Sequence, residues 1–306
     1  MSRFFGVVPP VVVPLLADGQ VDYPSYTRVL EHLIQGGCHG LFVLGSTSEV
    51  IFFDEATRQR IIEHSVKVVA GRLPVIVGVI DPGTERVIGH ARAAQQAGAD
   101  AVVVTAPFYA ITNQQETMDH FRRVRGAIDI PVVAYDLPVC VHTKLARSTT
   151  VQLAREGAIQ GLKDSSGDDG NTRYVILDTR DVSDFFVMTG SEIVVDSALL
   201  MGAHGVVPGL GNVDPAGYVR LWDAVQRGDA AAARAEQERL CRLFEIVWVA
   251  SGRLSGGASG VGGFKTAMRR LGLIATNTMT SPRGSLNEAE SQRVDEILRS
   301  VGLLAA

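Results

Sequence analysis

One lysine stands where an apolar run meets a polar turn. Lys163 closes the segment 158–162 (AIQGL) and is followed at once by Asp164-Ser165-Ser166. Ammonium groups are almost never fully buried unless they are paired. A neutral amine held in such a place can attack a carbonyl carbon and form a Schiff base. A lysine that extends to solvent from a strand end would give the same local pattern, so this segment alone leaves both interpretations open.

Hydroxyl groups follow other apolar runs in the same way. Tyr109 and Tyr135 come just after or at the end of such runs, and a tyrosine hydroxyl can both donate and accept a proton. Each could equally be an aromatic lid whose hydroxyl meets solvent. The segment Gly45-Ser46-Thr47-Ser48-Glu49 offers backbone N–H groups and hydroxyls that suit a carboxylate or an oxyanion. It could also be an ordinary strand-to-helix turn with Ser48 as the N-cap.

Together these residue types are typical of covalent catalysis on a keto acid. The lysine would condense with the keto carbon, and a tyrosine would relay protons while a carbon–carbon bond breaks. The small hydroxyl residues would hold the carboxylate.

The elements that must position these residues follow a repeated pattern. Short, continuously apolar runs, as expected for strands buried on both faces, alternate with longer stretches that carry apolar residues at helical spacing. The expected strands are 6–13, 40–44, 74–79, 101–105, 131–135, 161–163, 185–189 and 205–207, and the expected helices between them include 23–35, 54–70, 84–97, 113–127 and 147–155. Glycine turns such as Gly98-Ala99-Asp100 separate several helices from the next strand.

Eight such units predict an α/β fold, a (β/α)8 barrel, in which catalytic groups lie at the carboxyl ends of the strands. An open doubly wound sheet is the alternative, but no glycine-rich dinucleotide fingerprint follows the first strand. After Asp214-Pro215 only helices are expected, over 216–227, 230–249, 264–271 and 286–301. We therefore expect a barrel over residues 1–225 and a C-terminal helical extension over 226–306. The glycine- and serine-rich segment 251–263 predicts a flexible connector.

Bulk composition narrows the class of protein. The 306 residues carry a net charge of -4 and no long block of like charge, which gives no support for binding to nucleic acid or to a membrane surface. The three cysteines are widely spaced, which favours reduced thiols over a disulfide framework. No apolar run is long enough to span a bilayer, and the N-terminal segment lacks the usual features of a signal peptide. These features predict a cytoplasmic protein.

In the order and spacing of its motifs, the chain resembles the dihydrodipicolinate synthase / N-acetylneuraminate lyase family of Schiff-base aldolases, from about Val7 to the C-terminus. The motifs are Gly45 to Glu49, Pro107-Phe108-Tyr109, Tyr135-Asp136-Leu137-Pro138, Gly161-Leu162-Lys163-Asp164, Gly190-Ser191, Gly205-Val206-Val207, Gly211 to Pro215 and Phe264-Lys265-Thr266-Ala267. The resemblance implies a homotetramer of barrels that uses pyruvate or a related 2-keto acid and needs no metal or other cofactor.

The resemblance also assigns roles. Lys163 would be the Schiff-base lysine and Tyr135 the proton relay above it. Ser46 and Thr47 would bind the keto-acid carboxylate, and Thr47 would link the two tyrosines. Tyr109 would complete the relay by reaching into a neighbouring subunit.

Three departures from the family pattern affect these roles. Ser48 stands where the family usually has glycine, so its side chain would reshape the carboxylate pocket. Asp136 replaces the usual asparagine and would add a negative charge beside the site. Cys140 stands where lysine-biosynthetic synthases usually carry an arginine that holds the carboxylate of aspartate semialdehyde, and an uncharged thiol cannot make that bidentate contact.

Other candidate substrate-binding positions are Cys140, His142, Gly190, Ser191 and Val207. His142 could contact a substrate hydroxyl or carboxylate, and Ser191 a polyol chain, although a polar loop histidine and a turn serine are the plainer interpretations. Cys140 is expected to be a small lining residue rather than a reactive thiol. For Lys265 the sequence favours a surface position at the start of a helix.

The predicted function is therefore a class I, pyruvate-type aldolase or lyase that acts on a hydroxylated 2-keto acid such as a 2-keto-3-deoxy sugar acid. Three alternatives stay open: a keto-deoxy-sugar-acid dehydratase, dihydrodipicolinate synthase itself, and a non-catalytic barrel that binds a keto acid. The missing arginine ranks the synthase below the lyase and dehydratase.

Overall fold

Eight parallel strands form the centre of the computed structural model, which describes residues 4–305. Each strand pairs with its neighbour in the order β1-β8-β7-β6-β5-β4-β3-β2. The strands are β1 (Gly6–Val7), β2 (Leu41–Val43), β3 (Val75–Gly78), β4 (Ala101–Thr105), β5 (Val132–Asp136), β6 (Gly161–Asp164), β7 (Phe186–Thr189) and β8 (Gly205–Val206).

The segment after β1 closes the sheet into a ring. Pro10 forms an isolated parallel bridge with Phe42 of β2. The Val11 N–H donates to the Phe42 carbonyl at 2.8 Å, and the Phe42 N–H donates to the Pro9 carbonyl at 3.0 Å. The predicted (β/α)8 barrel is confirmed, although β1 is far shorter than the 6–13 run because its prolines cannot donate to a ladder.

Side chains fill the inside of the barrel. One buried cluster contains residues from most of the strands, among them Phe42, Val103, Tyr135, Met188 and Val207. A second, larger cluster lies between the strands and the surrounding helices. Both faces of each strand are therefore buried, which explains why the runs are apolar without alternation.

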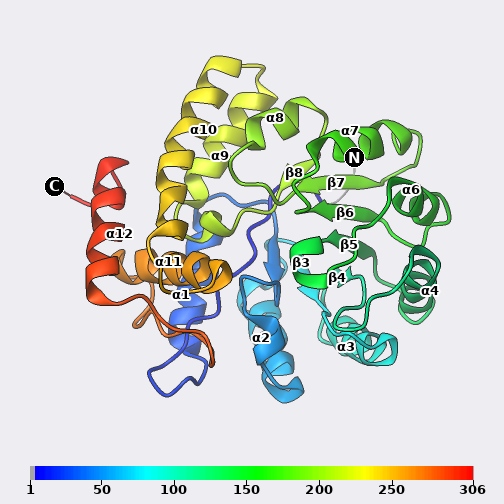
Figure 1. Cartoon of the computed structure of the whole chain (residues 1–306), viewed down its shortest axis with the longest axis horizontal. Coiled ribbons are helices and arrows are strands. Elements are labelled where there is room, and N and C mark those ends of the chain that lie inside the picture. Colours follow the sequence, from blue (N-terminus) through cyan, green and yellow to red (C-terminus); the bar gives the residue numbers. More distant parts are fainter. Residues whose placement is uncertain (1–3, 306) are drawn as a thin grey trace.

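Helices surround the ring (Figure 1). Those of the barrel are α1 (Tyr23–Gln35), α2 (Glu55–Val69), α3 (Thr84–Gln96), α4 (Gln114–Arg125), α5 (Pro138–Val141), α6 (Arg147–Arg155), α7 (Asp169–Asp178), α8 (Val195–Leu200) and α9 (Pro215–Gln226). The expected bounds of α1 and α6 are reproduced. The sequence predicts no helix at the positions of α5, α7 or α8, because these are short or lack a marked apolar stripe.

The C-terminal elements gather on one side of the barrel, coloured yellow to red in Figure 1. They are α10 (Ala230–Phe244), the 3-10 turn η3 (Glu245–Trp248), α11 (Gly256–Arg270) and α12 (Glu288–Ser300). Helix α10 packs against α9, and α11 packs against η3 and α12. Two further 3-10 turns, η1 (Val50–Phe52) and η2 (Gly209–Asn212), follow β2 and β8.

The expected flexible connector over 251–263 is wrong for most of its length, because α11 begins at Gly256. Its glycines serve close packing. A Cβ on Gly263 would lie 2.5 Å from the Ile246 carbonyl oxygen, and one on Gly262 would lie 2.7 Å from a Leu286 methyl carbon. Ser259 fixes the helix to η3 by donating to the Val247 carbonyl at 2.6 Å. Within residues 4–305, no helix is both long and apolar enough to cross a membrane.

Candidate active site

Lys163 lies on β6 inside the mouth of the barrel. In the sheet it is level with Tyr135 of β5 and Met188 of β7. Only 6% of its surface is exposed. Its Nζ lies 3.8 Å from the centre of the Tyr135 ring and 5.0 Å from that of Phe42. The amine therefore sits between two aromatic rings, out of bulk water and close to the predicted proton relay.

The carboxylate that follows Lys163 in the chain points elsewhere. Asp164 accepts hydrogen bonds from the Ser166 N–H at 2.8 Å, from the Ser166 hydroxyl at 2.7 Å and from the Thr172 hydroxyl at 2.7 Å. These bonds satisfy the carboxylate and hold the turn into α7. Within residues 4–305, no carboxylate forms an ion pair with Lys163.

Lys163 is distinctive among the four lysines of the chain. Lys144 pairs with Asp136, and Lys265 pairs with Glu49. Lys67 is exposed on α2. Among the described residues, Lys163 is thus the one lysine that is buried without a carboxylate, and its amine is free to meet a carbonyl compound.

Phe42 is a site residue that the sequence analysis missed. It is completely buried at the centre of β2, and its ring meets that of Tyr135 edge to face, with centroids 6.3 Å apart. Together with the ring of Tyr135, it forms the apolar wall around the Lys163 amine. Nothing in the sequence marks it, because a phenylalanine in the middle of a buried strand is indistinguishable from core.

The segment Gly45 to Glu49 after β2, here called the hydroxyl loop, contains two kinds of hydroxyl group. Ser46 and Thr47 are half-buried, and no hydrogen bond to another described residue engages their hydroxyls. Ser48 is completely buried; its hydroxyl donates to the Val11 carbonyl at 2.6 Å and accepts from the Gly45 N–H at 3.2 Å. Its one hydrogen is therefore used inside the fold. The geometry supports Ser46 and Thr47 as ligand-binding groups but not the Ser48 hydroxyl, which fixes the turn instead.

Tyr109 stands apart from the other predicted catalytic groups. It is 97% exposed and has a φ of 72°, a left-handed backbone conformation that is unusual for a bulky residue. Among the described residues no hydrogen bond joins it to Thr47 or Tyr135. The predicted relay is thus not assembled within a single chain.

The carboxylate of Asp136 is compensated. It forms an ion pair with Lys144 and accepts from the Leu145 N–H at 3.1 Å. Burial raises the pKa of Asp136, and its bonds with Lys144 and the Leu145 N–H oppose that rise. The expected additional negative charge beside the site is therefore neutralised by a neighbouring lysine.

The remaining predicted binding residues are spread around the mouth. Val207 lies in the buried cluster inside the barrel, and Ser191 donates its N–H to the Thr189 hydroxyl at 3.0 Å. A Cβ on Gly190 would collide with the Ser165 hydroxyl, so glycine is required there. His142 is exposed at the end of α5. Cys140 is exposed at the rim of a cavity that it shares with Ser46.

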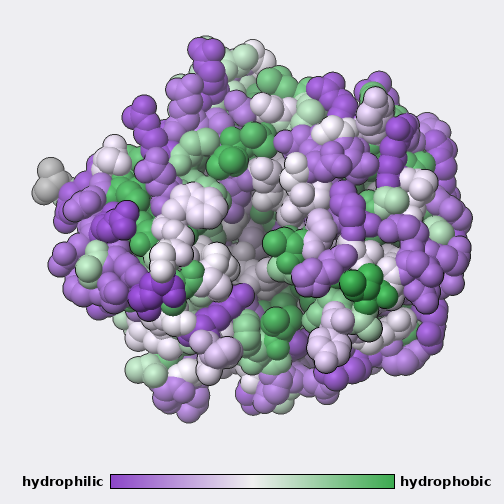
Figure 2. Space-filling view, in the orientation of Figure 1, coloured by the Kyte–Doolittle hydropathy of each residue, from purple (hydrophilic) through white to green (hydrophobic). Residues whose placement is uncertain are grey.

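That rim cavity has a volume of about 120 Å³. Polar groups in its wall are Ser46, Glu49, Thr105, Cys140 and Arg283, and the other lining residues are apolar. Figure 2 shows a face of the molecule that is hollowed near its centre, with hydrophobic side chains among neutral and hydrophilic ones around the hollow. Arg283 belongs to the C-terminal extension, and no motif pointed to it.

Lys265 is not the surface residue that the sequence favoured. It is completely buried; its Nζ donates to Glu49 Oε2 at 2.5 Å and to the Thr278 carbonyl at 2.9 Å. Burial lowers the pKa of Lys265, whereas Glu49 opposes this effect. The pair joins α11 to the hydroxyl loop of the barrel.

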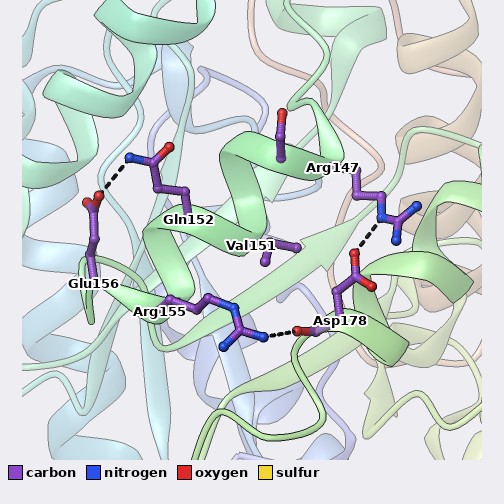
Figure 3. Close-up of a pocket in the computed structure, with 7 residues that line it drawn as sticks. Arg147, Val151, Gln152, Arg155, Glu156 and Asp178 are labelled. Atoms are coloured by element: carbon purple, nitrogen blue, oxygen red, sulfur yellow. Dashed lines mark hydrogen bonds and ion pairs between the residues drawn. The ribbon is translucent and has the colours of Figure 1, made fainter.

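A larger hollow, about 770 Å³, lies on the outside of the barrel along α6 (Figure 3). Arg147 donates to Asp178 at 2.5 Å, and Arg155 donates to the Asp178 carbonyl at 2.9 Å. Its other polar groups include Gln152 and Glu156, which also bond to each other. No lysine or tyrosine lines this hollow, so it offers no group for Schiff-base chemistry. Among the described residues, no cluster of histidine, cysteine, aspartate or glutamate side chains is arranged to hold a metal ion.

Comparison with known proteins agrees with this geometry. The model of the dihydrodipicolinate synthetase family matches residues 3–301. A 4-hydroxy-tetrahydrodipicolinate synthase of Methanoculleus marisnigri is 29% identical over 301 residues, which cover 98% of this chain and 100% of the relative. A DapA-like lyase of Halobacterium salinarum is 32% identical over 299 residues, 98% of this chain and 94% of the relative.

Solved structures show the same architecture. YagE of E. coli, a protein of the dihydrodipicolinic acid synthase family solved in complex with pyruvate, superposes with a TM-score of 0.92 at 27% identity and covers 98% of this chain and 99% of its own. Dihydrodipicolinate synthase of Bacteroides thetaiotaomicron gives a TM-score of 0.91 at 30% identity, with 97% and 98% covered.

Proposed function

Because this chain belongs to the dihydrodipicolinate synthetase family, whose members are Schiff-base-forming lyases and synthases, we propose that it acts on a hydroxylated 2-keto acid such as a 2-keto-3-deoxy sugar acid. It is an enzyme of the pyruvate aldolase type.

A single observation carries the proposal: the amine of Lys163 is buried against the ring of Tyr135 with no carboxylate partner among residues 4–305. A lysine kept for stability would be expected to have such a partner, as Lys144 and Lys265 do. A nucleophilic lysine must instead be close to a proton relay and accessible to a ketone.

The chemistry follows from these positions. The neutral amine adds to the keto carbon to give a carbinolamine, which loses water to form an iminium ion. Removal of the proton from the 4-hydroxyl group breaks the bond between C3 and C4, releases an aldehyde and leaves an enamine on the lysine. Protonation at C3 and hydrolysis then release pyruvate and restore the amine. Tyr135 is the proposed carrier of these protons.

Two further groups complete the proposed site. Ser46 and Thr47 would bind the keto-acid carboxylate with their free hydroxyls and the backbone N–H groups of the loop. Tyr109 would enter the site of a second copy of the chain, within a homotetramer. Its 97% exposure and unusual backbone conformation support that role, since both are difficult to explain in an isolated chain.

Condensation is the second candidate, because relatives such as that of Methanoculleus marisnigri bear the name of a synthase. In that direction the enamine of pyruvate would attack an added aldehyde such as aspartate semialdehyde. Loss of water from a keto-deoxy sugar acid, as in a dehydratase, would share the first Schiff base. Product analysis separates the three reactions: free pyruvate, a condensed acid, or a dehydrated keto acid.

The experiment that tests the proposal is borohydride trapping. The chain is incubated with pyruvate and borohydride, digested and analysed by mass spectrometry. We expect a reduced adduct on Lys163 alone, loss of that adduct and of turnover in Lys163→Ala, and no effect of Lys67→Ala on exposed α2. An adduct on another lysine, or none on the wild-type chain, would refute the proposal.

A further inference from the structure

The rim cavity contains a cation without a hydrogen-bonded partner. Nη1 of Arg283 is shielded from solvent, yet no hydrogen bond reaches it from any residue between 4 and 305. The carboxylate nearest to it, Oε1 of Glu49, is 3.9 Å away. The guanidinium carbon stands 4.9 Å from the centre of the Phe52 ring, which fixes its orientation through a cation–π contact.

The charges around Arg283 do not balance. Glu49 already accepts from Lys265 at 2.5 Å and from the Thr280 N–H and hydroxyl at 3.1 and 2.7 Å. One carboxylate thus serves two cations, Lys265 and Arg283. The Arg283 side chain keeps 23% of its surface exposed, so its charge, which Glu49 compensates only in part, can attract an anion that enters the cavity.

The same bonds hold Arg283 in place over the mouth. Glu49 and Lys265 tie the segment 278–280 to the barrel, and the Arg283 N–H donates to the Thr280 carbonyl at 2.8 Å. The backbone that carries Arg283 is therefore held by a buried network, and the Phe52 ring orients its guanidinium, which reduces the entropy lost on binding.

The cavity adjoins the Schiff-base site. Thr105 and Leu137 line it; Thr105 pairs with Tyr135 in the sheet, and Leu137 follows Tyr135 by two residues in the chain. Cys140 lies at its rim, within the electrostatic influence of both Arg283 and Lys163. Partial burial of its sulfur raises the pKa of Cys140, so the thiol does not supply the negative charge that Arg283 lacks.

We propose that Arg283 binds a second acidic group of the substrate, a carboxylate at the end remote from the keto carbon, with Ser46 and Cys140 beside it. This inference rests on the proposed function and specifies its substrate class. A cavity of about 120 Å³ is large enough for a carboxylate on a short carbon chain, since about 10–15 Å³ of such volume is enough to admit one water molecule. The apolar walls strengthen the charge-assisted pair.

The test compares two aldehydes that differ in charge. Pyruvate is condensed with 4-oxobutanoate, which carries a carboxylate, or with butanal, which does not, and kcat/KM is measured for each. The wild-type chain should prefer the acid. Arg283→Gln should reduce that preference roughly 10- to 100-fold, mainly by raising the KM for 4-oxobutanoate. Arg283→Lys should restore part of it.

Controls separate this inference from the proposed function. Arg227→Gln, an exposed arginine just after α9, should leave the preference unchanged. An equal preference in wild type and Arg283→Gln would overturn the inference even if pyruvate is trapped on Lys163. If no pyruvate adduct forms, butanoate and butanamide are titrated into both chains by calorimetry. If butanoate binds at least 10-fold more weakly to Arg283→Gln than to the wild type, the anion site is supported while the proposed function is not. Equal binding of butanoate to both chains overturns the anion site.

Discussion

At Glu192, burial opposes a negative charge near the barrel mouth. Its carboxylate accepts from the Leu210 N–H at 2.7 Å and from the Tyr218 hydroxyl at 3.1 Å. Burial nevertheless raises the pKa of Glu192 from 4.5 to about 7; the hydrogen bonds and the charge of Lys163 only moderate the rise. The protonated form is therefore favoured in the folded chain below about pH 7.

A pH-dependent difference in stability follows. Because the folded pKa lies above the unfolded one, the contribution of Glu192 is fully present below pH 4.5 and is lost as the pH rises to about 7. Glu192→Gln stays neutral at every pH. As the pH rises from 4.5 to about 7, its free energy of unfolding should therefore increase relative to that of the wild type by at most about 3 kcal/mol. Urea unfolding at several pH values measures it. Glu296→Gln, exposed on α12, should show no such trend, and an identical trend in both variants would contradict the prediction.

The sequence predicts a site residue where a chemically reactive side chain stands at the end of an apolar run. Lys163 and Tyr135 stand out because polar groups rarely end buried strands, and the structure places them side by side. Phe42 and Arg283 could not be found in this way. Phe42 has the local sequence of an ordinary core residue. Arg283 lies in the C-terminal extension and reaches the mouth only through tertiary packing.

The C-terminal helices are fixed to the barrel by a buried ion pair. Lys265 of α11 and Glu49 of the hydroxyl loop are both inaccessible to solvent. Removing one partner of such a pair leaves an uncompensated charge and typically costs about 3–5 kcal/mol. The pair also fixes the segment that leads to Arg283, so the extension contributes to the site as well as to stability.

Lys265→Met should therefore lower the free energy of unfolding by about 3–5 kcal/mol, measured by urea titration. In the single variant Glu49 keeps only its longer contact with Arg283, 3.9 Å away, in place of a directly hydrogen-bonded cation. In the double variant Lys265→Met/Glu49→Gln the buried carboxylate is removed as well, and the glutamine oxygen can still accept from Thr280. That variant should recover most of the loss. Equal destabilisation of the single and double variants would show that the ion pair is not the cause.

Element positions were largely predictable, whereas element types near glycine were not. The apolar runs locate all eight strands to within a few residues except at β1, where prolines end the ladder early. The prediction of a flexible connector over 251–263 was wrong because glycine and serine usually indicate flexibility. In α11 the same residues allow the helix backbone to approach Ile246, a contact between distant elements that composition cannot reveal.

On the scale of the whole molecule, exposed apolar side chains surround the mouth. Tyr109 is 97% exposed, Ile111 72%, Val139 78% and Ile51 53%. These residues belong to the segments that follow β2, β4 and β5, with Ile51 in η1 and Val139 in α5. Large exposed apolar groups of this kind are typical of a subunit interface, which supports the proposed homotetramer.

Analytical ultracentrifugation should accordingly find a species of four chains. Ile111→Asp should shift it to smaller species and lower kcat at least tenfold, since a charge at the interface would also withdraw Tyr109 from the neighbouring site. Ile111→Val retains the apolar contact and should behave as the wild type. A fully active single chain would contradict the prediction.

The scarcity of lysine has a practical consequence. Of 29 basic residues only four are lysines, and Lys163, Lys144 and Lys265 are buried or paired. Apart from the chain's own amino terminus, Lys67 on α2 is thus the side-chain amine most open to acylating reagents. Coupling of side-chain amines to a surface or a dye should therefore occur mainly at Lys67, on the outer wall of the ring and away from its reactive centre.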